Sequence, residues 1–237
     1  AYPGAIDEGK QLTIARRFAS FVSRGITPYE THPWTGSHAR IRVGYLSADF
    51  HDHATAHLML GMFKRHDRAR FEVFAYSYGP EDGSDYRARI RSEVEHFVDL
   101  ATLTDRDAAA RIHADQIDVL VDLKGYTREA RTGILAHCPA PVQVAWLGYP
   151  GSMGATFIDH AVVDATVVPP SARSHYSERP MYMPGTYQPN DDEQAIDAVA
   201  PTRREAGLPE KAVVFCCFCA HYKIDPAVFA AWMRILK

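Results

Sequence analysis

Cysteine is scarce in this sequence and long apolar runs are absent, and both features narrow the class of protein. Only four cysteines occur in 237 residues: Cys138 and the closely spaced Cys216, Cys217 and Cys219. This is not the spacing of a secreted disulfide framework, and it favours a reducing compartment. The longest apolar run, 212–220, is far shorter than the roughly 20 residues of a membrane helix. With no signal-peptide pattern in residues 1–10, we expect a soluble, cytoplasmic protein.

The chain also lacks a strong excess of either charge. Its formal net charge is −3 and no basic cluster stands out, so neither nucleic acid nor a membrane is an expected partner. The hydrophobic content of 46% and charged content of 23% are ordinary for a globular protein. A chain this long can bury a core without a disulfide or a metal. Its 12 histidines slightly favour an enzyme, because imidazole exchanges protons near neutral pH.

The two ends of the sequence suggest that it is part of a longer chain. It starts at Ala1 without a methionine, and it stops at Lys237 within a helical pattern. Val228, Phe229 and Trp232 recur at helical spacing, and no capping glycine or asparagine follows them. We therefore expect the chain to be cut at both ends.

Apolar strand-like segments alternate with helical patterns along most of the chain. No internal repeat of fixed period is visible. The alternation predicts an α/β fold, a Rossmann-like, doubly wound parallel sheet with helices on both faces. The predicted strands are 41–46, 71–77, 96–100, 117–123, 142–147 and 160–163, and the predicted helices between them are 55–65, 85–94, 104–115 and 128–136.

Three regions follow from this pattern. Residues 1–39 hold a connector, with an amphipathic helix over 9–23 and a loop rich in proline and glycine. Residues 40–200 form the main Rossmann-like domain, which ends in a long irregular connection over 169–201. Residues 201–237 begin a second α/β domain, with a strand at 212–218 and a helix after Pro226.

The loop after the first predicted strand carries three histidines and two aspartates, His51, His53, His57, Asp49 and Asp52. Ligands in doubly wound folds lie beyond the carboxyl ends of strands. A divalent metal site is one interpretation. A polar loop with a helix N-cap is another, and an acid/base or sugar-binding role for His53 is the third.

Two further loops and one helix hold candidate residues. Loop 146–155 contains three glycines, which fit a tight turn or a close approach to a ligand, but its spacing is not that of a dinucleotide or P-loop motif. In loop 218–226, Lys223 could neutralise a diphosphate or lie exposed at the surface. Cys217, Cys219 and His221 could hold a soft metal, although such cysteines more often belong to a core. His113, near the end of a helix, is alone no more than a core or surface histidine.

Several of these segments are similar to one known family. Residues 41–50 with His53 resemble the opening of the catalytic region of protein O-GlcNAc transferases, in particular of bacterial-type homologues. Segment 139–151 and segment 222–226 resemble the same family, and so do Tyr176-Ser177-Glu178 and Met183-Pro184. The resemblance runs from about Arg40 to the end, and several segments in the right order are more specific than one motif. Residues 1–39 look like the connector that follows the family's tetratricopeptide repeats.

The resemblance implies the N-terminal catalytic half of a two-domain GT-B glycosyltransferase. The donor would be UDP-N-acetylglucosamine and the acceptor a serine or threonine hydroxyl of a protein, with inversion at the sugar carbon and neither metal nor cofactor. His53 matches a histidine near the transferred sugar, His113 looks like a second active-site histidine, and Lys223 matches the lysine that stabilises the departing diphosphate. The predicted substrate-binding residues are Asp52, Thr55, Tyr149, Pro150, Gly151 and Tyr222.

The sequence departs from the family pattern at three positions. Cys219 and Ala220 stand where amide side chains are usual, and Ala54 stands where proline commonly follows the loop histidine. Most of the second domain and the upstream repeats are missing, so we expect this chain alone to bind UDP weakly and to transfer little sugar. A nucleotide-sugar epimerase and a non-catalytic scaffold of the same fold are the alternatives.

Overall fold

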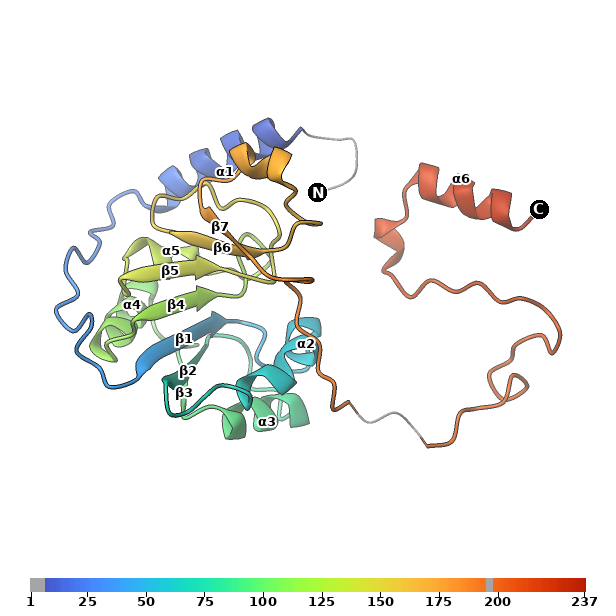
Figure 1. Cartoon of the computed structure of the whole chain (residues 1–237), viewed down its shortest axis with the longest axis horizontal. Coiled ribbons are helices and arrows are strands. Elements are labelled where there is room, and N and C mark those ends of the chain that lie inside the picture. Colours follow the sequence, from blue (N-terminus) through green and yellow to red (C-terminus); the bar gives the residue numbers. More distant parts are fainter. Residues whose placement is uncertain (1–6, 195–197) are drawn as a thin grey trace. The chain divides into compact units, whose positions relative to one another are not determined.

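The computed structural model describes residues 7–194 and 198–237 (Figure 1). The chain divides into two compact units, and the boundary between them lies between Glu193 and Gln194. The larger unit, from Asp7 to Glu193, holds the whole sheet. No helix in the described part of the chain is long and apolar enough to cross a membrane.

A seven-stranded sheet forms the centre of the larger unit, and every neighbouring pair of strands is parallel. The strand order is β3-β2-β1-β4-β5-β6-β7. The order reverses between β1 and β4, which makes their carboxyl ends the topological switch point of a doubly wound sheet. The strands are β1 Ile41–Ser47, β2 Phe71–Ser77, β3 His96–Asp99, β4 Val119–Asp122, β5 Val142–Ala145, β6 His160–Val163 and β7 Arg179–Tyr182.

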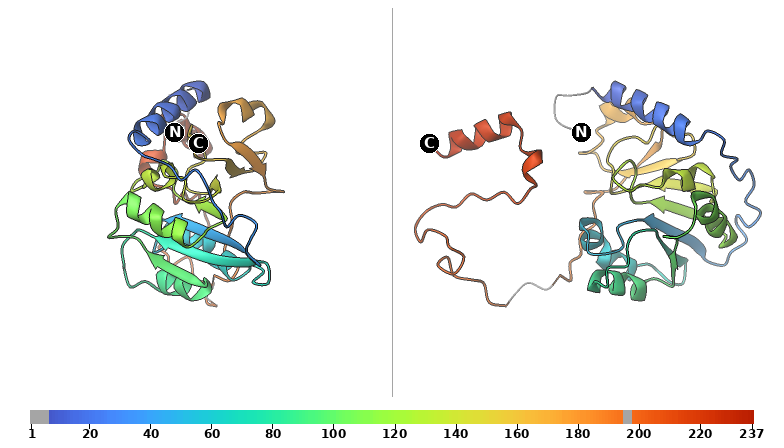
Figure 2. Two further views of the ribbon diagram at one scale, coloured as in Figure 1. Left: turned by 90° about the vertical axis from the view of Figure 1, so that its left-hand side faces the viewer. Right: turned by 180° about the vertical axis from the view of Figure 1, so that it is seen from behind.

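Helices cover both faces of this sheet (Figures 1 and 2). Side chains of successive strand residues point to opposite faces, so Tyr45 and Leu46 of β1 belong to two different buried clusters. Tyr45 packs with α2 and α3, whereas Leu46 packs with α1, α4 and α5. The predicted doubly wound fold is therefore confirmed. The helices are α1 Glu8–Val22, α2 Ala54–Phe63, α3 Asp85–Glu93, α4 Asp105–Ala114 and α5 Thr132–Ala136.

The helix predicted over 128–136 is shorter than expected, because α5 begins only at Thr132. Glu129 has a φ of 66°, in the left-handed region that no right-handed helix contains. Arg131, the N-cap residue, instead reaches back to α4, where its Nε donates to Asp105 Oδ1 at 2.8 Å. The residues after β4 thus form an irregular turn before the helix starts.

The connection predicted to be irregular over 169–201 contains two regular elements. A 3₁₀ helix, η1, spans Pro170–His175, and β7 adds a seventh strand beside β6. Pro180 within β7 made this strand hard to predict, because proline has no N–H to donate to a sheet. At the edge of the sheet that N–H is not required on the outer side.

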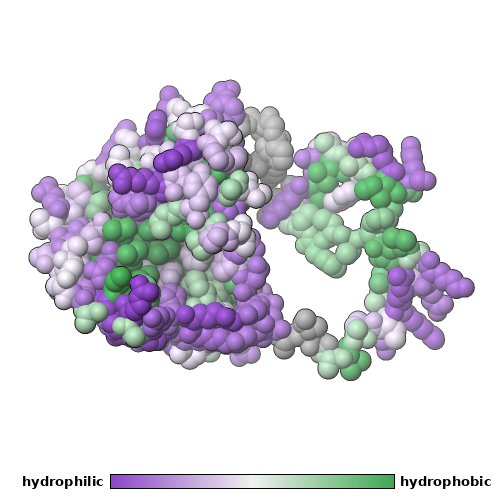
Figure 3. All heavy atoms as spheres, viewed as in Figure 1, coloured by the Kyte–Doolittle hydropathy of each residue, from purple (hydrophilic) through white to green (hydrophobic). Residues whose placement is uncertain are grey.

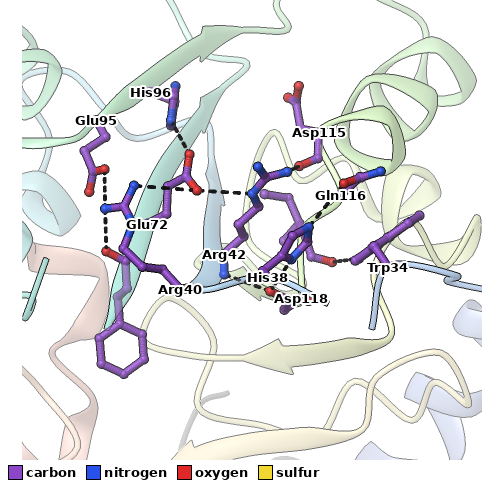
Figure 4. A network of polar contacts seen from close by, with 12 residues as sticks. Trp34, His38, Arg40, Arg42, Glu72, Glu95, His96, Asp115, Gln116 and Asp118 are labelled. Carbon is purple, nitrogen blue, oxygen red and sulfur yellow. Dashed lines mark hydrogen bonds and ion pairs between the residues drawn. The ribbon is translucent and has the colours of Figure 1, made fainter. Parts of the chain in front are cut away.

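Polar side chains close the amino edge of the sheet (Figure 4). Glu72 of β2 accepts from Arg42 Nε at 3.2 Å and pairs with His96 Nε2 at 2.8 Å. Burial opposes ionisation of Glu72, yet these two hydrogen bonds hold its pKa below the ordinary value. Asp118 accepts from the backbone N–H of Arg42 at 2.9 Å and pairs with His38 Nδ1 at 3.0 Å. The amino edge is therefore occupied by internal ion pairs.

The smaller unit contains the helix α6 Pro226–Ile235, which confirms the helix predicted after Pro226. It also contains a 3₁₀ helix, η2 His221–Lys223, that was not predicted. The predicted strand over 212–218 is wrong, because these residues form coil. None of the described strands pairs with this segment, and its apolar side chains lie at the surface (Figure 3). Phe218 is 97% exposed and Val213 is 79% exposed. That residues 201–237 begin a nucleotide-binding domain stays a prediction.

Candidate functional site

A buried ion pair joins the two strands at the switch point. Asp49 follows β1 and Lys124 follows β4, and Lys124 Nζ lies 2.8 and 3.0 Å from the two carboxylate oxygens of Asp49. Both side chains are only 5% exposed. Asp49 Oδ2 also accepts a hydrogen bond from Thr55 Oγ1 at 3.2 Å. Sequence reasoning missed Lys124, although a lysine directly after a buried strand, at the same sheet edge as Asp49, was a usable signal.

His53 is held directly beside this pair as the N-cap of α2. Its Nδ1 accepts the backbone N–H of Thr55 at 3.1 Å and lies 3.5 Å from Asp49 Oδ2. Burial lowers the pKa of His53, Asp49 opposes that shift, and Lys124 adds to it. The imidazole is therefore neutral near pH 7. Since Nδ1 is the acceptor, Nε2 carries the proton, and the side chain is 41% exposed.

The rest of this loop is tied to the next loop of the sheet edge. Asp52 pairs with His57 Nε2 at 2.7 Å, and its backbone N–H donates to Asp82 Oδ2 at 2.8 Å. That bond is the largest cause that lowers the pKa of Asp82 to about 2. His51 Nδ1 lies 3.9 Å from Asp82. In the described residues no three His, Cys, Asp or Glu side chains are placed to hold a metal ion, and chemistry without a metal stays a prediction.

The turn after β4 brings a second loop to the site. The backbone N–H groups of Lys124 and Gly125 donate to the buried carboxyl of Asp122 at 3.1 and 2.9 Å. Burial raises the pKa of Asp122 to about 6, although these bonds oppose the shift. Gly125 has a φ of 54°, and a Cβ at this position would lie 2.4 Å from Tyr149 Cβ. Only glycine therefore allows the two loops to pack this closely.

The glycine-rich loop 146–155 is firmly held. A Cβ on Gly148 would lie 2.2 Å from the carbonyl oxygen of Leu123, so the loop lies against the end of β4. The buried Glu178 accepts from Met153 N–H at 2.6 Å and from Ser152 Oγ at 2.7 Å. The loop is thus a tightly packed turn at the same edge as His53.

The three predicted binding residues of this loop share its packing. Half-buried Tyr149 lies with its ring centroid 5.7 Å from that of Tyr126, and Gly151 lies against the ring of Tyr149. The carbonyl oxygen of Pro150 accepts a hydrogen bond from the Tyr176 hydroxyl. The structure therefore brings Tyr149, Pro150 and Gly151 to the carboxyl edge, and their contact with a substrate stays a prediction.

His113 is not brought together with His53. Because α4 returns the chain from the carboxyl end of β3 to the amino end of β4, the last turn of α4 lies at the opposite edge of the sheet. There His113 stacks on Tyr29 with ring centroids 3.7 Å apart and contacts Trp34 at 4.6 Å. Burial, with His32 nearby, lowers its pKa. His113 thus belongs to an aromatic cluster at the amino edge, and a catalytic role for it stays a prediction.

Lys223 and Tyr222 belong to the smaller unit, in η2, where Lys223 is exposed. That Lys223 acts in the same active site as His53 therefore stays a prediction. Cys219 and Ala220, which replace the usual amides, precede η2, and Cys219 Sγ lies 3.1 Å from Cys217 Sγ.

Known proteins are similar to this chain over most of its length. The profile of the family described as glycosyl transferase family 41 matches residues 7–199 and 188–237. The Arabidopsis thaliana protein named probable UDP-N-acetylglucosamine–peptide N-acetylglucosaminyltransferase SEC is 40% identical over 253 residues, which cover 100% of this chain and 26% of that protein. A Caenorhabditis elegans UDP-N-acetylglucosamine–peptide N-acetylglucosaminyltransferase is 43% identical over 158 residues, 66% of this chain and 14% of that protein.

A solved structure agrees with the sequence comparisons. A mutant of the Thermobaculum terrenum O-GlcNAc transferase is similar with a TM-score of 0.75 and 28% identity, over 84% of this chain and 39% of that chain. This chain therefore spans about a quarter or less of the length of the two relatives named above.

Proposed function

The chain belongs to glycosyl transferase family 41, and from this premise we propose that the protein transfers N-acetylglucosamine from UDP-N-acetylglucosamine to serine or threonine hydroxyls of proteins. The observation that carries the proposal is the 40% identity to a relative named for this transfer, over the whole chain. The sheet is the Rossmann-like N-terminal half of a GT-B fold. A site at its switch point agrees with where such folds bind ligands.

Apart from His113, each candidate residue has a role in an inverting, metal-independent and cofactor-free transfer. Displacement at the sugar carbon develops negative charge on the departing UDP, which the Lys223 ammonium would neutralise in a cleft that excludes water. His53 would contact the transferred sugar or the attacking hydroxyl. Asp52, Thr55, Tyr149, Pro150, Gly151 and Tyr222 would complete the binding surface around the donor.

We also propose further domains and a cytoplasmic location for the full-length protein. The relatives are much longer than this chain, which supports a C-terminal nucleotide-binding domain that residues 201–237 begin. Upstream tetratricopeptide repeats would present the acceptor proteins. A cytoplasmic location is supported by the four cysteines, which form no disulfide in the described structure.

A transfer assay with the protein in its full natural length tests this function. Labelled UDP-N-acetylglucosamine and a serine-containing peptide should give a labelled, inverted product. His53→Ala and Lys223→Ala should each lower kcat/KM by about 100-fold or more, whereas Lys211→Ala, an exposed lysine of the same unit, should not. Isomerised UDP-sugar without an acceptor would indicate an epimerase, and UDP binding without turnover a scaffold. Near-normal turnover by both variants would remove the assigned roles.

A further inference from the structure

Lys124 is a buried lysine to which neither the family resemblance nor the proposed mechanism gives a role. Lysine is almost never buried without a partner, and here the partner is Asp49, bonded through both of its oxygens. With only 5% of its side chain exposed, Lys124 has little surface to offer a substrate. Its effect on the site must therefore pass through the groups that surround it.

We propose that Lys124 is a positioning residue: by holding Asp49, it keeps the His53 imidazole neutral, with its proton on Nε2, as a hydrogen-bond donor to the donor substrate. The proton lies on Nε2 because Nδ1 accepts a hydrogen bond from the Thr55 N–H, which also fixes the ring at the start of α2. Among the described residues Nε2 has no hydrogen-bond partner, which leaves its N–H for a ligand. The inference rests on the proposed function only where it takes the ligand of His53 to be the sugar donor.

The role of Lys124 is clearest from what Asp49 would do without it. Asp49 Oδ2 already lies 3.5 Å from His53 Nδ1. A buried carboxylate that loses its cation is strongly destabilised, and it therefore stabilises a positive charge on the nearest group that can be protonated. A proton on Nδ1 would make His53 that charge, and Thr55 N–H would then lose its acceptor. Lys124 thus prevents His53 from pairing with Asp49 in the charged form.

The other charged groups around His53 also disfavour a charged imidazole, or they are already paired with other residues. From the loop before α2 and from α2 itself, His51 and His57 both disfavour a charged imidazole. Asp52 pairs with His57, and Asp82, between β2 and α3, lies beside His51. After β4, Asp122 is bonded to backbone N–H groups. Asp49 is therefore the carboxylate that most strongly favours protonation of His53, and Lys124 neutralises it.

Nitrogen-detected NMR of the 237-residue chain tests the inference without any donor or acceptor. In the unaltered chain, His53 should be protonated on Nε2 at pH 7. Lys124→Met should raise the proton affinity of His53 by roughly tenfold or more and place a proton on Nδ1. Lys124→Met combined with Asp49→Asn should restore the original titration, because the uncompensated carboxylate is gone. Lys64→Met, which removes an exposed lysine of the same region paired with Glu193, is the matched control and should change nothing.

The pH profile of transfer supplies a second readout in the full-length protein. Lys124→Met should move the acidic limb of the kcat/KM profile to higher pH, by the same amount as the NMR titration. The double variant should move this limb back. A His53 titration in Lys124→Met that matches the unaltered chain would overturn the inference. Should that variant not fold, Lys124→Gln keeps a hydrogen-bond donor without the charge and must raise the His53 proton affinity in the same direction. A negative transfer assay would refute the proposed function and leave the NMR result standing.

Discussion

Two apolar runs of this chain were both predicted to be strands, and they have different structures. Residues 117–123 contain β4, where Leu120 is fully buried, whereas residues 212–218 are coil with Phe218 97% exposed. β4 pairs with β1 on one side and β5 on the other, but no described strand pairs with 212–218. A strand needs neighbours because its backbone N–H and C=O groups must be paired if they are to be buried. An apolar run predicts a strand only where the fold supplies that neighbour.

We expect the largest difference in stability when one side chain of each run is truncated to alanine. Leu120→Ala should lower the free energy of unfolding by about 2–5 kcal/mol, because it leaves a cavity in a closed core. Phe218→Ala should change it by less than about 0.5 kcal/mol, because its ring is already in water. Urea titrations of the 237-residue chain, followed by circular dichroism, measure both. Equal losses would contradict the comparison.

A smaller effect is expected from glycines of the two units. A Cβ on Gly79 would lie 1.8 Å from the carbonyl oxygen of Ala48, so Gly79→Ala forces apart the loops that follow β1 and β2. We expect a loss of about 1–3 kcal/mol in the same urea titration. Gly207→Ala meets no atom within 4 Å, so only its φ of 67° opposes the change, at about 1 kcal/mol. A larger loss of stability in Gly207→Ala than in Gly79→Ala would contradict this expectation.

Limited proteolysis compares the protection of the two units without any substitution in the chain. Arg203, Arg204 and Lys211 are exposed in the smaller unit, whereas Arg87 and Lys124 are buried in the larger one. Brief trypsin treatment, read by mass spectrometry, should cut first at the exposed group, because a protease requires an accessible, extended backbone. First cuts within the sheet would show that the larger unit is the less protected of the two.

The smallest effect is a pH dependence carried by His66 in the larger unit. Burial lowers the pKa of His66, so the folded chain binds its proton more weakly than the unfolded chain. Stability should therefore be full above the ordinary histidine pKa near 6.5 and be lost as the pH falls through it. Urea titrations at pH 7.5 and 5.5 should show this loss, and His66→Gln should reduce it. An unchanged pH slope in the variant would refute the assignment.

Local patterns predicted most of the larger unit. The alternation of apolar runs and helices predicted six of the strands and the doubly wound topology, because each of those strands is one short apolar segment that is continuous in sequence. β7 was missed because Pro180 is tolerated only at a sheet edge, and the sequence does not show which strand is the edge. The start of α5 was misplaced because Glu129 adopts a positive φ, which its residue type does not predict.

Local patterns predicted only part of the candidate site. His53 and its loop were found from their place after a strand, but the pairing of Asp49 with Lys124 joins residues 75 positions apart through the sheet order. His113 lies at the other edge because α4 ends there, a placement that the sequence alone does not show. Contacts between strands that are not consecutive decide the site, and they become visible only once the sheet is assembled.

The most direct test of the central claim is a crystal structure of the full-length protein with UDP-N-acetylglucosamine. We predict the hexose at the carboxyl edge of the sheet, with His53 Nε2 within hydrogen-bond distance of a sugar oxygen. Density for the donor at the amino edge, among Arg42, Glu72 and His96, or at any place out of reach of His53, would contradict it.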